Sequence, residues 1–339
     1  MTANIHSLIL AAGKGTRMKS ELPKVVHPIL GKPMVSYVID AVKSVGSNRT
    51  ILVTGFKSDL VKEILAKENV FFVEQTEQLG TGHAVQCYAK TDPEIPEHLL
   101  VVCGDTPLIS AQTLKSMIQL HLEKKPGITM MTLDMVEPGN YGRIIRKDGE
   151  VIAIREAKDC SPEELKIKEV NLAVYLFAAD FLFKNIFKLD NNNRQNEYYL
   201  TDLVAMAQQQ GIKILACKEK DESSTLGINS RQHLALVGSI LQKKILEQHM
   251  DNGVTIVNPD QTFIGPDCQI GADSTIWPGC VIKGKTRIGT NTEIGPNCLI
   301  ADSEIGDNCK LNFCVIQNST ISEESELKPF STIQANTQI

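Results

Sequence analysis

The sequence predicts an α/β fold: a mainly parallel sheet flanked by helices, followed by a long linker helix and a short parallel β-helix. Two observations support this fold class. Apolar runs suited to buried strands alternate with helix-like segments from residue 5 to about 228. Beyond residue 252, isoleucines recur every six residues, a period that fits neither a helix nor an amphipathic strand. We therefore expect a sheet domain over 1–229, a linker helix over 230–252 and a β-helix over 253–339.

The first domain is predicted to alternate strands and helices. The expected strands are Ile5–Leu10, Thr50–Thr54, Val70–Val73, Leu99–Val102, Thr129–Leu133, Arg143–Ile145, Val151–Arg155, Asn171–Phe177 and Ile212–Cys217. The expected helices are Met34–Val45, Leu60–Leu65, one that begins at Ala84, one after Asp202, and the linker helix Arg231–Met250, which Ser230 starts. Ligands of such a sheet bind at the carboxyl ends of its strands, where the polar, glycine-containing segments fall.

The second repeat pattern is that of a hexapeptide β-helix, in which three short strands make one coil and each isoleucine points into the prism. Seven isoleucines keep strict register, and the pattern then continues with three five-residue steps, before Ile305, Ile316 and Ile321. These positions are Ile264, Ile270, Ile276, Ile282, Ile288, Ile294 and Ile300, then Ile305, Leu311, Ile316, Ile321, Leu327, Ile333 and Ile339.

The composition is that of an ordinary globular protein, with 339 residues, 42% hydrophobic, 22% charged and a net charge of −5. This charge gives no reason to expect nucleic acid or an anionic membrane as a partner. The N-terminal stretch does not read as a signal peptide, and no apolar run approaches the roughly 20 residues of a membrane span. The nine cysteines form no C-x-x-C pair, which favours small buried hydrophobes in a reducing cytoplasm.

The turn after the first strand is the main candidate for binding a phosphate. It reads Leu10-Ala11-Ala12-Gly13-Lys14-Gly15-Thr16-Arg17, and Lys24 follows Pro23. Small residues let backbone N–H groups approach a ligand, and two cations suit a polyphosphate. The stretch matches neither the Walker A loop nor G-x-G-x-x-G, so a structural turn and a solvated charge pair remain alternatives.

Asp105 comes just after the predicted strand Leu99–Val102. A carboxylate at the end of a parallel strand suits Mg²⁺, which takes one or two carboxylates together with phosphate oxygens and water. The alternative is an aspartate that caps the turn before Thr106-Pro107.

Other polar segments also follow predicted strands. Gln75 and Gln78 with Gly80-Thr81-Gly82 could read the edge of a pyrimidine, or could form a generic loop. Residues that could hydrogen-bond sugar hydroxyls are Tyr141-Gly142-Arg143, Glu156 and Asn171. His83 reads as an ordinary helix-start residue rather than a base.

Together these motifs resemble the sugar-1-phosphate nucleotidylyltransferases. Leu10–Met18 followed by Leu22-Pro23-Lys24 is similar to the signature of that family. With the hexapeptide tail, three further segments look like the bacterial N-acetylglucosamine-1-phosphate uridylyltransferases, the first half of a bifunctional family: Gln75–Ala84, Tyr141–Ile144 and Glu197–Asp202. The resemblance covers residues 5–339 and implies a Rossmann-like nucleotidyltransferase sheet and a left-handed β-helix.

The resemblance also implies roles for individual residues. Arg17 and Lys24 would stabilise phosphate charge, and Asn229 would join Asp105 on Mg²⁺. The nucleotide would contact the main chain of Leu10, Ala11, Ala12 and Gly13, and its uracil would be held by Gln75, Gly80 and Thr81. The ribose and the metal would lie at Cys103, Gly104 and Asp105. The amino sugar would be held by Gly142, Glu156 and Asn171. The implied reaction transfers the uridylyl group of UTP to N-acetylglucosamine 1-phosphate, and pyrophosphate leaves toward Arg17. It would take place in the cytoplasm and supply cell-envelope precursors.

Two departures fall in the implied pocket wall. Cys103 stands where the family commonly has tyrosine, and Asn171-Leu172-Ala173 replaces the usual Asn-Thr/Ser-Gly. These changes leave the preferred sugar open, so a related enzyme that uses another sugar phosphate or dTTP is an alternative.

The β-helix itself leaves three further expectations. The family's acetyltransferase site lies on a longer β-helix with a histidine, and no histidine follows His249, so we expect no acetyltransferase activity. An acyltransferase and a non-catalytic assembly protein are the remaining alternatives. The resemblance suggests a homotrimer formed through the β-helix.

Overall fold

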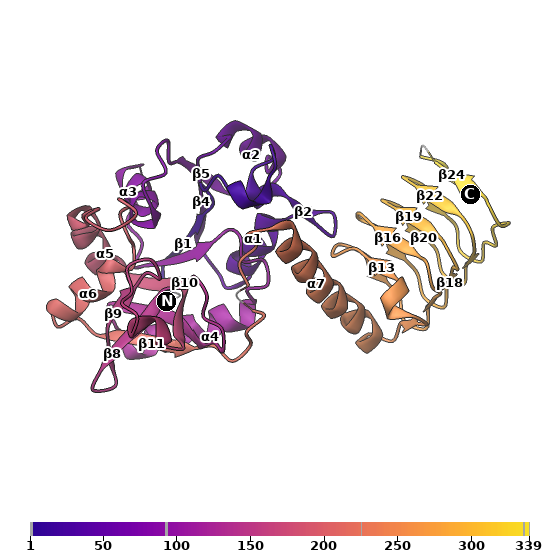
Figure 1. The fold of residues 1–339 in the computed structure, drawn as a ribbon. Coiled ribbons are helices and arrows are strands. Elements are labelled where there is room, and N and C mark those ends of the chain that lie inside the picture. Colours follow the sequence, from indigo (N-terminus) through magenta and orange to yellow (C-terminus); the bar gives the residue numbers. More distant parts are fainter. Residues whose placement is uncertain (1–2, 92–93, 225, 335, 339) are drawn as a thin grey trace. The chain divides into compact units, whose positions relative to one another are not determined.

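The computed structural model describes residues 3–91, 94–224, 226–334 and 336–338. The chain forms two compact units, and each is described by itself. The first comprises Met1–His27 and Pro33–Arg231, and the second comprises Pro28–Lys32 and Gln232–Ile339. Figure 1 shows the path of the chain through both units. No helix formed by the described residues is long and apolar enough to cross a membrane.

The first unit is built on a sheet of nine strands in the described part of the chain, with the order β11-β7-β10-β6-β1-β4-β5. Off this path, β8 pairs with β10 and β9 pairs with β8. Neighbours β6, β1, β4 and β5 run parallel, as do β11 and β7, whereas β10 runs antiparallel to both β6 and β7. The strands are β1 (Ile5–Leu10), β4 (Arg49–Thr54), β5 (Phe71–Glu74), β6 (His98–Cys103), β7 (Ile128–Asp134), β8 (Arg143–Lys147), β9 (Glu150–Arg155), β10 (Glu169–Ala178) and β11 (Ile214–Lys218).

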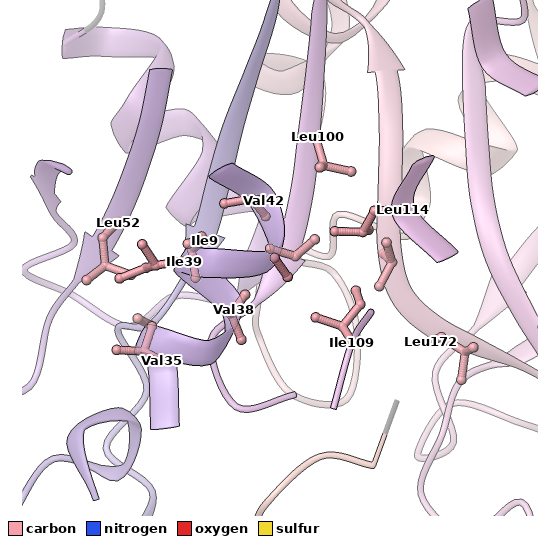
Figure 2. Packing of buried hydrophobic residues seen from close by; sticks show 14 of the residues in the cluster. Ile9, Val35, Val38, Ile39, Val42, Leu52, Leu100, Ile109, Leu114 and Leu172 are labelled. Atoms are coloured by element: carbon pink, nitrogen blue, oxygen red, sulfur yellow. The ribbon is translucent and has the colours of Figure 1, made fainter. Parts of the chain in front are cut away.

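Helices cover both faces of this sheet. They are α1 (Met34–Ser44), α2 (Ser58–Ile64), α3 (Thr81–Thr91), α4 (Ala111–Lys124), α5 (Ala179–Asn185) and α6 (Asp202–Gln209). Successive strand residues enter opposite cores, so Leu8 packs with the side of α3 and α6 while Ile9 packs with α1 and α4. Figure 2 shows Val38 and Ile39 of α1 in the second of these cores. Burial on both faces explains why the strands read as continuous apolar runs.

The predicted elements are present, with three differences, one of which is an unpredicted hairpin over residues 28–33. Helix α3 begins at Thr81 rather than at Ala84, so the loop after β5 is shorter than expected. Helices α4 and α5 were not predicted from the sequence. In α4 the side chain of Ser110 caps the first turn by accepting from the Thr113 N–H at 3.0 Å.

The second unit consists of α7 (Arg231–Asp251), the hairpin β2–β3 (Pro28–Ile29 and Lys32–Pro33, of which Pro33 counts with the first unit) and a parallel β-helix. The three sides of the β-helix are β12-β15-β18-β21, β13-β16-β19-β22-β24 and β14-β17-β20-β23. These short strands are β12 (Thr255–Ile256), β13 (Phe263–Ile264), β14 (Gln269–Ile270), β15 (Thr275–Ile276), β16 (Val281–Lys283), β17 (Arg287–Ile288), β18 (Glu293–Ile294), β19 (Leu299–Ala301), β20 (Glu304–Ile305), β21 (Lys310–Leu311), β22 (Val315–Gln317), β23 (Thr320–Ile321) and β24 (Thr332–Ile333).

The six-residue period is confirmed as the inward row of the β-helix. The repeat positions from Ile276 to Leu327 are buried in one core, and Ile270 and Ile333 pack against that core while partly exposed. Ile339, the last predicted repeat position, lies outside the described residues.

Candidate functional site

The candidate site lies at the carboxyl ends of the parallel strands β1, β4 and β6. The Ala11 N–H donates to the Val53 carbonyl and the Gly104 N–H donates to the Leu10 carbonyl, each over 2.9 Å. These bonds hold the chain leaving β1 between its two neighbours. Among the described residues nothing lies within 4 Å of the position that a Cβ on Gly13 would take, so this part of the turn faces open space.

Gly15 determines where Lys24 can lie. Its φ of 62° is in the left-handed region, and a Cβ there would come within 2.6 Å of the Lys24 Cβ. A side chain at this position would therefore strain the backbone and displace the lysine.

A cleft of about 280 Å³ opens at this edge of the sheet. Ten of its lining residues were predicted from the sequence: Leu10, Ala11, Ala12, Gly13, Lys24, Gln75, Gly80, Thr81, Cys103 and Asp105. Of the other four, Gln78 was considered with Gln75 as a possible reader of a pyrimidine edge, whereas Val25, Ala84 and Glu197 were not proposed as binding residues. Gly104 does not line the cleft itself, but its N–H donates to the carbonyl of the cleft residue Leu10.

Four charged or polar side chains converge at one end of the cleft. The Lys24 ammonium makes an ion pair with Oδ2 of Asp105 and lies 3.4 Å from Oδ1 of Asn229. Arg17 donates to the same Asn229 oxygen over 2.8 Å. The segment before Asn229 is anchored here because the Ile228 N–H donates to the Asp105 carbonyl over 2.9 Å.

This cluster fits a small divalent cation. Asp105 and Asn229 already direct one oxygen each at a single cation, the Lys24 ammonium, and hard oxygen donors are what Mg²⁺ prefers. Within the described residues, no group of three or more His, Cys, Asp or Glu side chains could hold a metal ion. Mg²⁺ commonly takes one or two carboxylates and completes its shell with substrate phosphate oxygens and water.

The loop after β5 forms the opposite wall of the cleft. Gln75 is buried, and its side-chain amide donates to the Gly80 carbonyl over 3.0 Å. Gly80 has φ 104°, and a Cβ there would meet the Tyr198 carbonyl at 2.7 Å. The Tyr198 N–H donates to the Leu79 carbonyl, so the loop rests on the Glu197–Leu200 segment. His83 contacts the Glu77 carbonyl at 2.9 Å, a local bond within this loop.

A second group of predicted residues is not among those that line the cleft. It consists of Gly142, Glu156 and Asn171. The Asn171 N–H donates to the Gly142 carbonyl over 2.9 Å, and a Cβ on Gly142 would lie 3.6 Å from Glu156 Oε2. Thr201 donates to Glu156 Oε1 over 3.1 Å, yet burial still raises the pKa of this carboxyl above its usual value.

Cys103 connects the two groups. Its Sγ lies 3.9 Å from the carbonyl oxygen of Ala173, and it also lines the cleft. Burial and then the Asp105 charge raise the pKa of the Cys103 thiol to about 12, so the thiol stays protonated. Ala173 has φ 54°, in the left-handed region, at a register shift of β10 between Asn171 and Tyr175.

Glu197 is the cleft residue that the sequence analysis placed in a motif without giving it a role. Glu197 lines the cleft, its Cβ lies next to Gly80, and burial raises the pKa of its carboxyl. The one signal that could have found it is its place in Glu197–Asp202, the segment on which the Gln75 loop rests.

Two family descriptions match the chain. Residues 7–152 match the MobA-like NTP transferase domain, and residues 267–302 match the bacterial transferase hexapeptide with six repeats. The bifunctional protein GlmU of Thermoanaerobacter pseudethanolicus is 48% identical over 334 residues, which cover 98% of this chain and 72% of that protein. The chain belongs to the GlmU family.

Other family members are similarly close, and one solved structure shares the fold. GlmU of Fervidobacterium nodosum is 46% identical over 97% of this chain and 71% of its own length, and GlmU of Clostridioides difficile is 42% identical over 99% and 73%. A crystal structure of UDP-glucose pyrophosphorylase complexed with UDP-glucose is 20% identical, with a TM-score of 0.58 over 72% of this chain and all of that one. The last likeness shows the fold alone. The expected resemblance to a nucleotidyltransferase with a hexapeptide tail is therefore confirmed.

Proposed function

We propose that this GlmU-family chain transfers the uridylyl group of UTP to N-acetylglucosamine 1-phosphate, forming UDP-N-acetylglucosamine and pyrophosphate. The observation that carries the proposal is the cluster of Arg17, Lys24, Asp105 and Asn229 at the end of the cleft. Two cations, a carboxylate and an amide oxygen at one point suit a reaction between two polyanions. We place the reaction in the cytoplasm, where its product serves cell-envelope synthesis, with neither nucleic acid nor membrane as a partner.

The residues of the chain divide the work of binding. The main chain from Leu10 to Gly13 would lie along the nucleotide, and Gln75, Gly80 and Thr81 would hold the uracil, which offers both donors and acceptors. Cys103 and Gly104 would flank the ribose. Gly142, Glu156 and Asn171 would hold the amino sugar through the network that joins them to Thr201.

The chemical step needs positioning more than acid or base catalysis. A phosphate oxygen of the sugar phosphate attacks the α-phosphorus in line, and a phosphate dianion is already a nucleophile without a general base. Arg17 and Lys24 would orient the phosphates and stabilise the charge that develops on the leaving pyrophosphate. A divalent cation, which we take to be Mg²⁺, would be held by Asp105 and Asn229 and would neutralise phosphate charge when bound.

The test is pyrophosphate release from UTP and N-acetylglucosamine 1-phosphate with Mg²⁺. We expect Arg17→Ala and Asp105→Ala each to lower kcat by about 100-fold, the effect of losing one charge-stabilising contact. Lys62→Ala is the matched control, because Lys62 pairs with Asp59 and Glu74 on the exposed surface. Near-normal rates for both site variants would refute the assignment.

A substrate panel separates this proposal from its relatives. Faster turnover with another sugar 1-phosphate or with dTTP would identify a related nucleotidylyltransferase. Binding of UTP without any pyrophosphate release would identify a non-catalytic assembly protein. Glucosamine 1-phosphate with acetyl-CoA is run beside these as the test for acetyl transfer.

We also propose that the chain is a homotrimer assembled through one side of the β-helix. On the β13–β24 side, four of the five outward residues before the inward row are apolar and partly buried, namely Phe263, Val281, Leu299 and Val315, and the fifth is the exposed Thr332. The corresponding positions on the other two sides are Thr255, Thr275, Glu293 and Lys310, and Gln269, Arg287, Glu304 and Thr320. An apolar row on one of three sides suits burial against copies of the same prism.

Light scattering tests the assembly. Leu299→Glu places a charge in the apolar row and should convert the trimer to monomers. Thr320→Glu, on the β14–β23 side, is the control and should leave the mass unchanged. A wild-type chain that is monomeric at high concentration would contradict the proposal.

A further inference from the structure

Three buried cysteines follow one another in a column inside the β-helix. Cys280, Cys298 and Cys314 each stand one residue before a strand of the same side, namely β16, β19 and β22. The Val281 N–H donates to the Cys298 carbonyl over 2.8 Å, and the Leu299 N–H donates to the Cys314 carbonyl over 2.9 Å. All three side chains are at most 1% exposed, so their thiols share the interior of the prism.

Two of these thiols are in direct contact. The Sγ atoms of Cys298 and Cys314 are 3.5 Å apart. Neighbouring strands of a sheet lie about 4.8 Å apart, within the roughly 4.4–6.8 Å that separates the Cα atoms of disulfide-linked cysteines. Joining these sulfurs therefore requires a side-chain movement rather than a rearrangement of the coils.

The fold does not require thiols at this corner of the coil. The position just before the strand is also buried on the other two sides, where most coils place hydroxyls: Ser274 and Thr292 before β15 and β18, and Thr286, Ser303 and Ser319 before β17, β20 and β23. Cys309 occupies the same position before β21, but its N–H donates to the hydroxyl of Thr292 over 3.2 Å, so its neighbour in the preceding coil is not a thiol. Cys309 is thus a buried thiol in the same core whose neighbour in the preceding coil carries a hydroxyl, whereas Cys298 has a thiol as its neighbour.

We propose that Cys298 and Cys314 are an oxidation site, at which a peroxide converts the pair into a disulfide between successive coils. The sulfur of Cys298 attacks one peroxide oxygen, the O–O bond breaks, and a sulfenic acid and one water form. The sulfur of Cys314 then displaces the hydroxyl group as a second water, and the S–S bond closes. The two thiols give up two electrons and two protons, which the peroxide takes up.

Cys298 is taken as the attacking sulfur because it is the middle thiol of the column, one coil away from both Cys280 and Cys314. Hydrogen bonds from the thiols of Cys280 and then of Cys314 lower the pKa of Cys298, and the thiolate is the reactive form. The same contacts raise the pKa of both neighbours. Burial restricts the oxidant to a molecule as small as hydrogen peroxide. Cys280, on the other side of Cys298, can enter the disulfide by thiol exchange.

The test uses the full chain, hydrogen peroxide, and alkylation of the remaining thiols before mass measurement. Free thiols should fall from nine to seven, and the unalkylated mass should fall by about 2 Da. Protease fragments that contain Cys298 and Cys314 should stay joined until a reductant is added. A chain closed in this way should melt roughly 5 °C higher, because the unfolded state loses freedom.

Variants assign the bond to these residues. Cys298→Ser should abolish it, and serine fits because Ser303 fills the equivalent corner in another column. Cys309→Ser is the matched control and should lose two thiols like the wild type. Cys314→Ser should move the linkage to Cys280 and Cys298, and failure to do so would refute the exchange step. The proposal is wrong if Cys298→Ser loses thiols like the wild type, or if Cys309 oxidises as fast as Cys298 without forming a disulfide.

Discussion

Replacing Ala173 with glycine should stabilise the first unit. Ala173 has φ 54°, where an L-residue with a Cβ costs about 1–2 kcal/mol. Glycine removes this strain but adds about 0.4–1 kcal/mol of freedom to the unfolded chain. The free energy of unfolding should therefore rise by about 0.5–1 kcal/mol, which for a unit of this size raises its melting temperature by about 2 °C.

Calorimetry on the full chain is the suitable assay, because the only tryptophan, Trp277, lies in the second unit and cannot report on the first. Ala205→Gly, in the interior of α6, is the control. Alanine suits a helix interior, so glycine there should destabilise the unit by about 0.5–1 kcal/mol. If Ala205→Gly behaves in this way and Ala173→Gly leaves the melting temperature unchanged or lower, the argument from backbone strain is refuted.

Three further predictions concern the site loop and two buried titratable groups. Gly15→Ala should lower kcat by roughly 10-fold by displacing Lys24, with thermal unfolding largely preserved; an unchanged kcat would show that Lys24 does not depend on Gly15. Burial and then the His98 charge hold the pKa of His121 at about 4. Its neutral ring therefore contributes stability above pH 6.5 that is lost as the pH falls toward 4. In urea unfolding, the free energy by which His121→Gln is less stable than the wild type should shrink as the pH is lowered over that range. Burial and then the Asp190 charge raise the pKa of Asp202 to about 6, so ionising this carboxyl costs stability as the pH rises from about 4 to 6. Over that window the free energy of unfolding of Asp202→Asn should rise relative to that of the wild type. A difference between the two that stays constant in urea unfolding would contradict this prediction.

Periodicity in the sequence predicted most of the fold. The six-residue repeat from Ile264 onward is a direct record of inward positions, because each coil offers one such position per side. That Gly13 and Asp105 line one cleft followed from the rule that parallel strands carry their ligands at one edge. Helix α4 was missed because only four of its fourteen residues are buried, so its apolar stripe is narrow.

Contacts between distant segments were beyond the reach of the pattern. Glu197 reaches the cleft from an irregular segment, where no period indicates the direction of a side chain. The direct pairing of Lys24 with Asp105 depends on the path that Gly15 permits, which composition does not report. The second-unit packing of Pro28–Lys32 likewise had no signal, because a five-residue turn carries too few apolar positions to show a partner.

That short hairpin determines how the two units can be separated. Ile29 is buried, and a Cβ on Gly238 of α7 would lie 3.8 Å from its side chain. Lys32 lies 3.5 Å from Asp267 in the first coil. A first unit truncated just before α7 would therefore keep the Pro28–Lys32 hairpin, which begins four residues after Lys24, without the packing partners of the second unit. Its exposed apolar residues would favour aggregation. Clean dissection of the catalytic unit takes a second edit, in which Pro28–Lys32 is replaced by a short polar turn.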